Sequence, residues 1–137
     1  MKYSRRGFGM LLPALAAAQS KPLPTLPSRA FKFEDLPVAM MGENRILPVM
    51  RGATNSGFPI EVHETDLAAG AQPHAAHKHL AIEMFLVRQG LLDVTVNGET
   101  TRLTAGSILY VNSNDMHGLH NPGPDRTKYF VIALGPA

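Results

Sequence analysis

The sequence predicts an all-β fold, a jelly-roll barrel or sandwich made by a single domain. Its 137 residues are the length of one domain. Its 11 prolines and 12 glycines are spread along the chain and give frequent turns. The sequence has no repeat of fixed period and no convincing helical pattern after its first residues. Short apolar runs between closely spaced turns therefore favour many short strands over a helical bundle.

The N-terminus predicts an export signal at residues 1–18. It begins with three basic residues: Lys2, Arg5 and Arg6. A nine-residue apolar stretch, 10–18, follows and ends in an Ala-x-Ala cleavage site. That stretch is too short to cross a bilayer, which needs about 20 residues. Residues 4–8, Ser-Arg-Arg-Gly-Phe, resemble the twin-arginine signal; an ordinary secretory signal or an uncleaved basic N-terminus is the alternative.

We therefore expect an exported bacterial protein, periplasmic or secreted, with no stable membrane anchor after cleavage. The isoelectric point of about 9.2 belongs mostly to the signal. From Gln19 onward, ten Lys and Arg stand against eleven Asp and Glu, a net charge of about −1. No basic stripe with interleaved aromatic residues is found there, so we expect no nucleic-acid partner. The lack of cysteine excludes disulfides, thiolate catalysis and Cys-based zinc sites.

After the signal, residues 19–30 contain three prolines and are expected to be an extended linker to a domain at 31–137. Apolar runs bounded by turns predict strands at 31–36, 45–50, 58–67, 80–88, 91–96, 100–104, 107–111 and 129–134. Residues 41–44 are turn-prone. Asn97-Gly98 is a strong signal for a hairpin between two of the strands.

Glu83 stands out by its chemistry, because it lies in the middle of the apolar run 80–88. A buried carboxylate is costly unless it has a proton, a cationic partner or a metal. His77 and His79 are also odd-numbered, so one extended segment would project them from the same face as Glu83. The other face is apolar too: Leu80, Ile82, Met84 and Leu86. Both faces should be covered, and a homodimer interface is one way to cover the second.

Two motifs around these residues resemble those of the cupins. The first consists of Gly70, His77, His79, Glu83 and Gly90. The second consists of Gly106, His117 and Asn121, with Asn112 and Asn114 where the family has Pro and Gly. Asn tolerates the left-handed conformation, so Asn114 departs little from the pattern. The resemblance spans 70–121 and implies the cupin jelly-roll barrel, a double-stranded β-helix.

The resemblance implies that His77, His79, Glu83 and His117 bind one divalent transition metal. Three imidazoles and a carboxylate suit Mn, Fe, Ni, Cu or Zn. A twin-arginine route carries folded proteins, so the ion would be acquired in the cytoplasm, where scarce free Cu and Zn favour Mn or Fe. The alternative is a degenerate cupin with a polar but metal-free pocket.

The implied function is an enzyme, dioxygenase- or isomerase-like, acting on a small oxygen-bearing substrate. Glu83 would be the catalytic ligand that loosens or accepts a proton. A non-enzymatic module that holds a small ligand or a metal stays open, because no general base outside the ligand set is evident. At the barrel mouth, Arg51, His74 and Tyr110 are the candidates for that role.

The same parity argument predicts the pocket. Phe85, Val87 and Leu119 share the parity of Glu83 and His117 and should face inward. Tyr129 or Phe130 should lie across from them, in a small and largely apolar pocket. His63 alternates onto the polar face of its strand and is expected to face solvent. His74 and His120 stand at positions that the family does not use as ligands.

Overall fold

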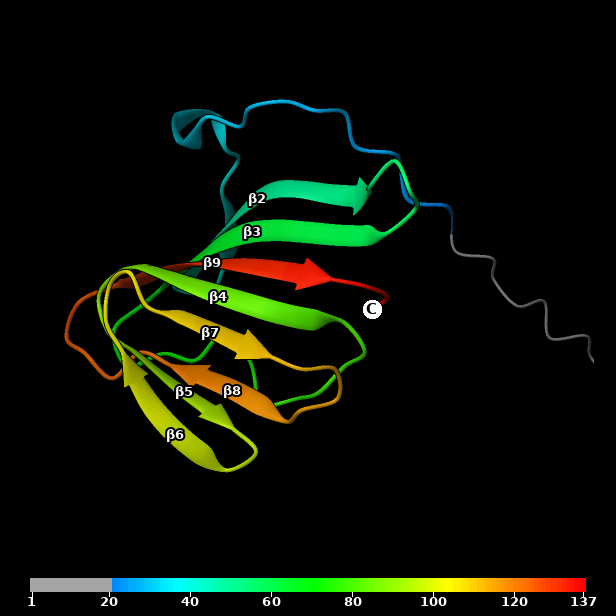
Figure 1. Ribbon diagram of the computed structural model, residues 1–137. Helices are drawn as coiled ribbons and strands as arrows, with labels where there is room; N and C mark the ends of the chain where they lie inside the picture. Colours follow the sequence, from blue (N-terminus) through cyan, green and yellow to red (C-terminus); the bar gives the residue numbers. More distant parts are fainter. Residues whose placement is uncertain (1–20) are drawn as a thin grey trace, which may run out of the picture.

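Two antiparallel β-sheets form the domain in the computed structural model, which describes residues 21–137 (Figure 1). The six-stranded sheet has the order β1-β2-β3-β9-β4-β7, and the three-stranded sheet has the order β6-β5-β8. The all-β prediction is therefore confirmed. The predicted signal, residues 1–18, lies outside the described residues. Within residues 21–137, no helix has the length and apolar character needed to cross a membrane.

The elements follow one another along the chain after a single 3₁₀ turn, η1. In order they are η1 (Phe33–Asp35), β1 (Ala39–Met41), β2 (Asn44–Ala53), β3 (Pro59–Leu67), β4 (Ile82–Gln89), β5 (Leu92–Val96), β6 (Glu99–Leu103), β7 (Ile108–Val111), β8 (His117–His120) and β9 (Thr127–Leu134). Seven of the eight predicted strands have a counterpart in this order. The hairpin at Asn97-Gly98 joins β5 to β6, with φ of 48° and 86° at the two residues.

The predicted strand at 31–36 is wrong. Residues 33–35 form η1, closed by hydrogen bonds from Asp35 N to Lys32 O and from Leu36 N to Phe33 O. Glu34 and Asp35 have low strand propensity, and Pro37 restricts Leu36 to an extended conformation that ends the turn. The strand that pairs with the start of β2 is instead β1, across the turn at Gly42, whose φ is 61°.

The N-terminal segment contacts the barrel before η1. Pro24 O accepts a hydrogen bond from Ala53 N, and Leu26 N donates one to Ala53 O, both at 2.8 Å. Gly52 permits this close approach, because a Cβ there would lie 2.5 Å from Pro24 O. Part of the predicted linker is thus held against the end of β2. From there the segment 29–37, called the strap below, passes along β2 toward β1 (Figure 1).

The hydrophobic core fills the space between the two sheets. Its buried members come from both: Leu67, Phe85, Val87, Leu92, Val94, Val111, Leu119, Tyr129 and Val131. Inward side chains of β3, β9 and β4 alternate with outward ones, as the antiparallel registers require. The core therefore fixes which side chains of these strands face the interior.

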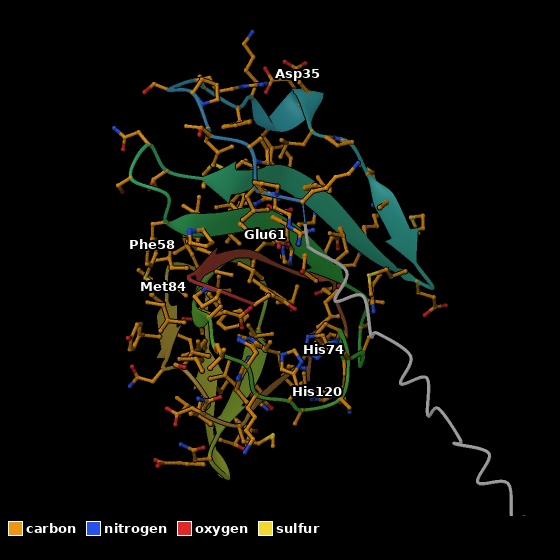
Figure 2. All side chains as sticks on the ribbon, turned by 90° about the vertical axis from the view of Figure 1, so that its right-hand side faces the viewer. Asp35, Phe58, Glu61, His74, Met84 and His120 are labelled. Atoms are coloured by element: carbon orange, nitrogen blue, oxygen red, sulfur yellow. The ribbon has the colours of Figure 1, made fainter. Side chains whose placement is uncertain are left out.

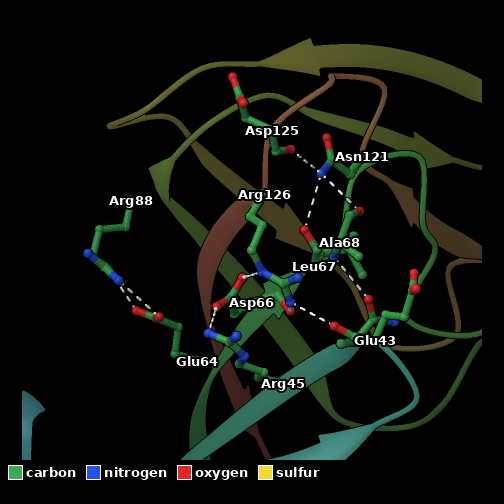
Figure 3. A network of polar contacts seen from close by, with 11 residues as sticks. Glu43, Arg45, Glu64, Asp66, Leu67, Ala68, Arg88, Asn121, Asp125 and Arg126 are labelled. Carbon is green, nitrogen blue, oxygen red and sulfur yellow. Dashed lines mark hydrogen bonds and ion pairs between the residues drawn. The ribbon is translucent and has the colours of Figure 1, made fainter.

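Buried ion pairs hold the outer side of the large sheet (Figure 3). Arg88 binds the carboxylate of Glu64 through two hydrogen bonds of 2.7 and 3.0 Å, and the Glu64 side chain is only 1% exposed. Arg126 donates to Asp66 at 2.6 Å, and Arg45 lies 3.5 Å from the same carboxylate. These pairs connect β2, β3, β4 and the start of β9.

Asn121 ties the chain after β8 to the end of β3 (Figure 3). The fully buried side-chain amide donates to the carbonyls of Leu67, Ala68 and Asp125 at 2.8 to 3.2 Å. Its oxygen accepts a hydrogen bond from Gly123 N at 3.0 Å. The last residue of the second motif therefore has a structural role.

Candidate metal centre

The four predicted ligands come together at the inner wall of the barrel. His77 and His79 lie in the segment before β4, Glu83 lies near the start of β4, and His117 opens β8. One ligand atom from each residue can be chosen so that all four lie within 4.8 Å of one another. This spacing suits a single ion bound by all four side chains.

The first two histidines reach the centre by a different route from the one that parity predicted. The strand β4 begins only at Ile82, so His77, His79 and Glu83 do not share one continuous strand. His77 forms an isolated bridge with His117, through backbone hydrogen bonds of 3.0 and 2.8 Å. His79 O accepts a hydrogen bond from Asn114 N at 2.7 Å. The two histidines of the first motif are therefore positioned by backbone contacts with the second motif: the bridge to His117 and the hydrogen bond from Asn114.

Asn114 adopts the left-handed conformation that the sequence predicted, with φ of 63°. Asn supports this conformation at a smaller cost than most residues. The turn sends Asn114 N toward His79 O and then leads into β8. The departure from the usual glycine leaves the geometry of the second motif intact.

Glu83 is the hub of the centre. Its Oε2 lies 3.0 Å from Nε2 of His117 and 3.3 Å from Nε2 of His79. The side chain of His117 is 2% exposed and that of Glu83 is 14% exposed. The carboxylate that stood out in an apolar run thus lies against two imidazole nitrogens, and a cation between these three ligand atoms would compensate its burial.

Backbone carbonyls orient two of the imidazoles. Nδ1 of His79 lies 2.9 Å from Ala81 O, and Nδ1 of His117 lies 2.9 Å from Asp115 O. A carbonyl only accepts, so each Nδ1 donates its proton and each Nε2 keeps a lone pair facing Glu83. This second contact is the usual way in which a metal-binding histidine is oriented.

His77 has a lowered pKa, chiefly because of burial and then because of the neighbouring His74, His117 and His79. A neutral imidazole is the form that binds a metal ion. Three imidazoles and one carboxylate, with two imidazoles oriented by carbonyls, fit a divalent transition metal.

His74 and His120 do not join the four-residue set. His74 is exposed, and its ring stacks on that of His77 with centroids 4.2 Å apart. His120 is paired with Asp93 in the β5–β8 ladder and differs in parity from His117, so it faces the other side of β8. Figure 2 shows both residues near the segment before β4.

A cavity of about 900 Å³ lies between this centre, the β2–β3 side of the barrel and the strap. Of the predicted pocket residues, Phe85, Leu119 and Tyr129 line it. Val87 is buried in the core without lining it, and Phe130 points away because it alternates with Tyr129. Burial raises the pKa of the Tyr129 phenol, so this side chain keeps its proton and adds no charge to the cavity.

The prediction that His63 faces solvent is wrong. Its side chain is 24% exposed and lines the cavity together with Glu61. Alternation places Glu61, His63 and Thr65 on one face of β3. The strand pairing and the cavity lining show that this face is the inner one. Of the three mouth candidates, Arg51 and His74 line the cavity; Tyr110 is on β7, 53% exposed, and bonds to Asn112.

The comparisons agree with the fold and the motifs. A sequence profile of the cupin domain matches residues 63–133, about half of the chain. The chain is a member of the cupin family. A search of curated protein sequences gives no match.

Solved structures share the cupin fold at low sequence identity. They include an RmlC-like cupin from Shewanella frigidimarina, with a TM-score of 0.66 and 21% identity over 80% of this chain and 93% of that one. KdgF from Halomonas sp. has a TM-score of 0.66 and 18% identity, covering 78% and 94%. A predicted oxalate decarboxylase from Thermotoga maritima has a TM-score of 0.67 and 14% identity, covering 79% and 100%. At these identities the likeness concerns the fold alone, so this cupin's function must be argued from its own site.

Proposed function

We propose that this cupin is a metal-dependent enzyme acting on a small, oxygen-bearing substrate. The observation that carries the proposal is the position of the His77–His79–Glu83–His117 centre in the wall of a cavity. A structural metal site is normally closed off by its ligands, whereas a catalytic site keeps a side open to substrate. Here Glu83 and His117 are themselves part of the cavity lining, so this centre faces the space that a substrate would occupy.

A divalent ion held by these four residues would act as a Lewis acid toward substrate oxygens or bring dioxygen to the substrate. Nε2 of His79 and of His117 would be held in place by the carbonyls behind each ring. Glu83, already shared between two imidazoles, is the ligand placed to loosen and to accept a proton. Phe85, Leu119 and Val131 would exclude water from one side of the substrate.

The cavity sets the size of the substrate. A volume of about 900 Å³ is within the range of sites for small molecules. Its walls combine apolar side chains with a few charged ones, which suits a compact molecule with polar ends. A diol, a hydroxy-carbonyl compound or a catechol meets this description, since each offers two oxygens to one ion.

Binding of a bidentate oxygen ligand tests the proposal. The full chain loaded with Mn(II) is titrated calorimetrically with acetohydroxamate, and turnover of hydroxyacetone and catechol is followed by NMR and by oxygen uptake. We expect one acetohydroxamate per ion, turnover of at least one compound, and loss of both in His117→Ala but not in His120→Ala. If the chain binds the ion but binds neither acetohydroxamate nor a substrate, the proposed enzyme function is wrong and the metal-holding module is favoured.

We also propose that the protein is exported after it has bound Mn or Fe. The support is the twin-arginine-like Ser4-Arg5-Arg6-Gly7-Phe8 together with a His-rich site that, in a metal mixture, would favour Cu or Zn. Replacing Arg5 and Arg6 by Lys should stop export and leave metal-loaded protein in the cytoplasm. The same metal content after export by an unfolded-chain route would contradict this explanation of the arginines.

A homodimer is a third part of the proposal. The outer face of β4 and β7 carries exposed apolar side chains, with Ile108 64% exposed and Tyr110 53% exposed. These residues pair with Leu86 and Met84, which adds apolar area to the same face. We expect sedimentation to give twice the chain mass for the wild type and the single mass for Ile108→Glu. A wild-type monomer at high micromolar concentration would contradict the dimer.

A further inference from the structure

The register of the large sheet places a second charged group in line with the metal centre. Glu61 of β3 pairs with Ala133 of β9, and Ala133 pairs with Glu83 of β4. Glu61 and Glu83 therefore lie in one row, two strands apart, which separates their backbones by about 10 Å. The residue between them is alanine, so no large side chain fills the space over this part of the sheet.

His63 belongs to the next row of the same inner face. It pairs with Val131, which pairs with Phe85, and all three line the cavity. Nδ1 of His63 lies 3.5 Å from a carboxylate oxygen of Glu61. The cavity is therefore bounded on one side by the four-residue centre and on the other by a His–Glu pair that this centre does not use.

Burial and the nearby carboxylates act in opposite directions on the pKa of His63. Burial lowers the pKa of His63, and Glu61 opposes the shift. Its neutral form donates Nδ1–H toward Glu61 and leaves a lone pair on Nε2. The titratable and charged groups of the cavity wall around His63 are Arg51 on β2, Glu61 on β3, Glu83 on β4, His117 on β8, Tyr129 on β9, His74 before β4, and Arg29, Lys32 and Asp35 of the strap.

We propose that His63, oriented by Glu61, is a catalytic base of this cavity and takes a proton from a substrate whose oxygens are bound at the His77–His79–Glu83–His117 centre. The inference rests on the proposed enzyme function and narrows its substrate to a small α-hydroxy-carbonyl compound. Such a molecule places two oxygens at the centre and a C–H bond toward β3. Glu61 acts through His63 and is a positioning residue.

The proposed step balances without an oxidant. The C–H bond beside the carbonyl breaks, the proton goes to Nε2 of His63, and the electron pair stays on the substrate as an enediolate. His63 becomes an imidazolium, which the carboxylate of Glu61 stabilises. The proton of the substrate's hydroxyl group moves to the former carbonyl oxygen, and the proton on His63 returns to the neighbouring carbon; this restores His63 and gives an isomer of the substrate. A general base of this kind contributes roughly 100- to 10,000-fold to a rate.

Deuterium exchange tests the step directly. The full chain loaded with Zn(II) is incubated with hydroxyacetone in D₂O, and loss of the CH₂OH proton signal is followed by NMR. We expect exchange in the wild type, a fall of about 100-fold or more in His63→Gln and a smaller fall in Glu61→Gln. Metal content and melting temperature should be unchanged in both variants, and His120→Gln is the matched control. Exchange at the wild-type rate in His63→Gln would overturn the inference.

A second readout does not depend on activity. In ¹⁵N-histidine spectra of the Zn(II)-loaded chain, acetohydroxamate should shift the Nε2 signal of His63 and leave that of His120 in place. Glu61→Gln should lower the pKa of His63 in the same spectra, because it removes the carboxylate that opposes the effect of burial. If acetohydroxamate binds but His63 does not respond, the inference fails and the proposed function stands. If acetohydroxamate does not bind at all, the proposed function fails and the inference with it.

Discussion

Replacement of Asn121 by Ala should destabilise the domain by about 3 kcal/mol. The fully buried side chain makes four hydrogen-bond contacts: its two amide N–H groups are shared among three carbonyls, and its oxygen accepts one hydrogen bond. A net value of about 1 kcal/mol for each would give about 4 kcal/mol. Ala68 O keeps a second hydrogen bond from Ala71 N, so that carbonyl is not left unpaired and the loss is smaller.

The assay is equilibrium urea unfolding of the metal-free chain, with the wild type measured beside Asn121→Ala. A loss of about 3 kcal/mol corresponds to a melting temperature lower by about 10 °C for a domain of this size. Asn112→Ala is the matched control, since Asn112 is exposed and its side chain accepts a hydrogen bond from the exposed Tyr110 hydroxyl; it should change stability by less than about 0.5 kcal/mol. A loss under about 1 kcal/mol in Asn121→Ala would refute the view that this motif residue holds β3 to the chain after β8.

Three further predictions concern stability. Chelation should lower the melting temperature, because an ion at 100 times its Kd contributes about 2.7 kcal/mol. Acid should do likewise, since protonation of the histidine ligands releases the ion. No shift with chelator would favour a metal-free pocket. Arg88→Met should cost about 3 kcal/mol by leaving buried Glu64 unpaired, and adding Glu64→Leu should restore most of it in urea unfolding. Gly90→Ala should cost more than about 2 kcal/mol, because φ is 82° and the new Cβ would lie 2.7 Å from Thr127 Oγ1, whereas Gly57→Ala, with φ of 86° and open space, should cost only about 1 kcal/mol. Equal losses in the two glycine variants would contradict the contact with Thr127.

The sequence was most informative where local chemistry dominates. The hairpin at Asn97-Gly98 and the strands of continuous apolar character follow from turn conformation and alternation alone. The strand β8 was missed because His117–His120 is short, contains Gly118 and has Leu119 as its one apolar residue. Its position depends on backbone pairing with β5, which lies far away in the sequence.

The site also combines features that local sequence determines with features that depend on long-range contacts. His77, His79, Glu83 and His117 could be selected from motif spacing, but the contact that places the first two is the backbone bridge between His77 and His117, which spacing does not reveal. The environment of His63 depends on the strap and on β2, whose arrangement over the mouth is a tertiary feature. The choice between Tyr129 and Phe130 required the β9 register, since alternation admits either until one inward residue is fixed.

The measurement that tests the central claim most directly is the metal content of single variants. Wild type, His77→Ala, His79→Ala, Glu83→Ala, His117→Ala, His74→Ala and His120→Ala are purified under one protocol, and each is analysed by inductively coupled plasma mass spectrometry. The account predicts one transition-metal ion per chain in the wild type, marked loss in the four ligand variants, and wild-type occupancy in His74→Ala and His120→Ala. An empty site in His120→Ala beside a filled site in His117→Ala would contradict it.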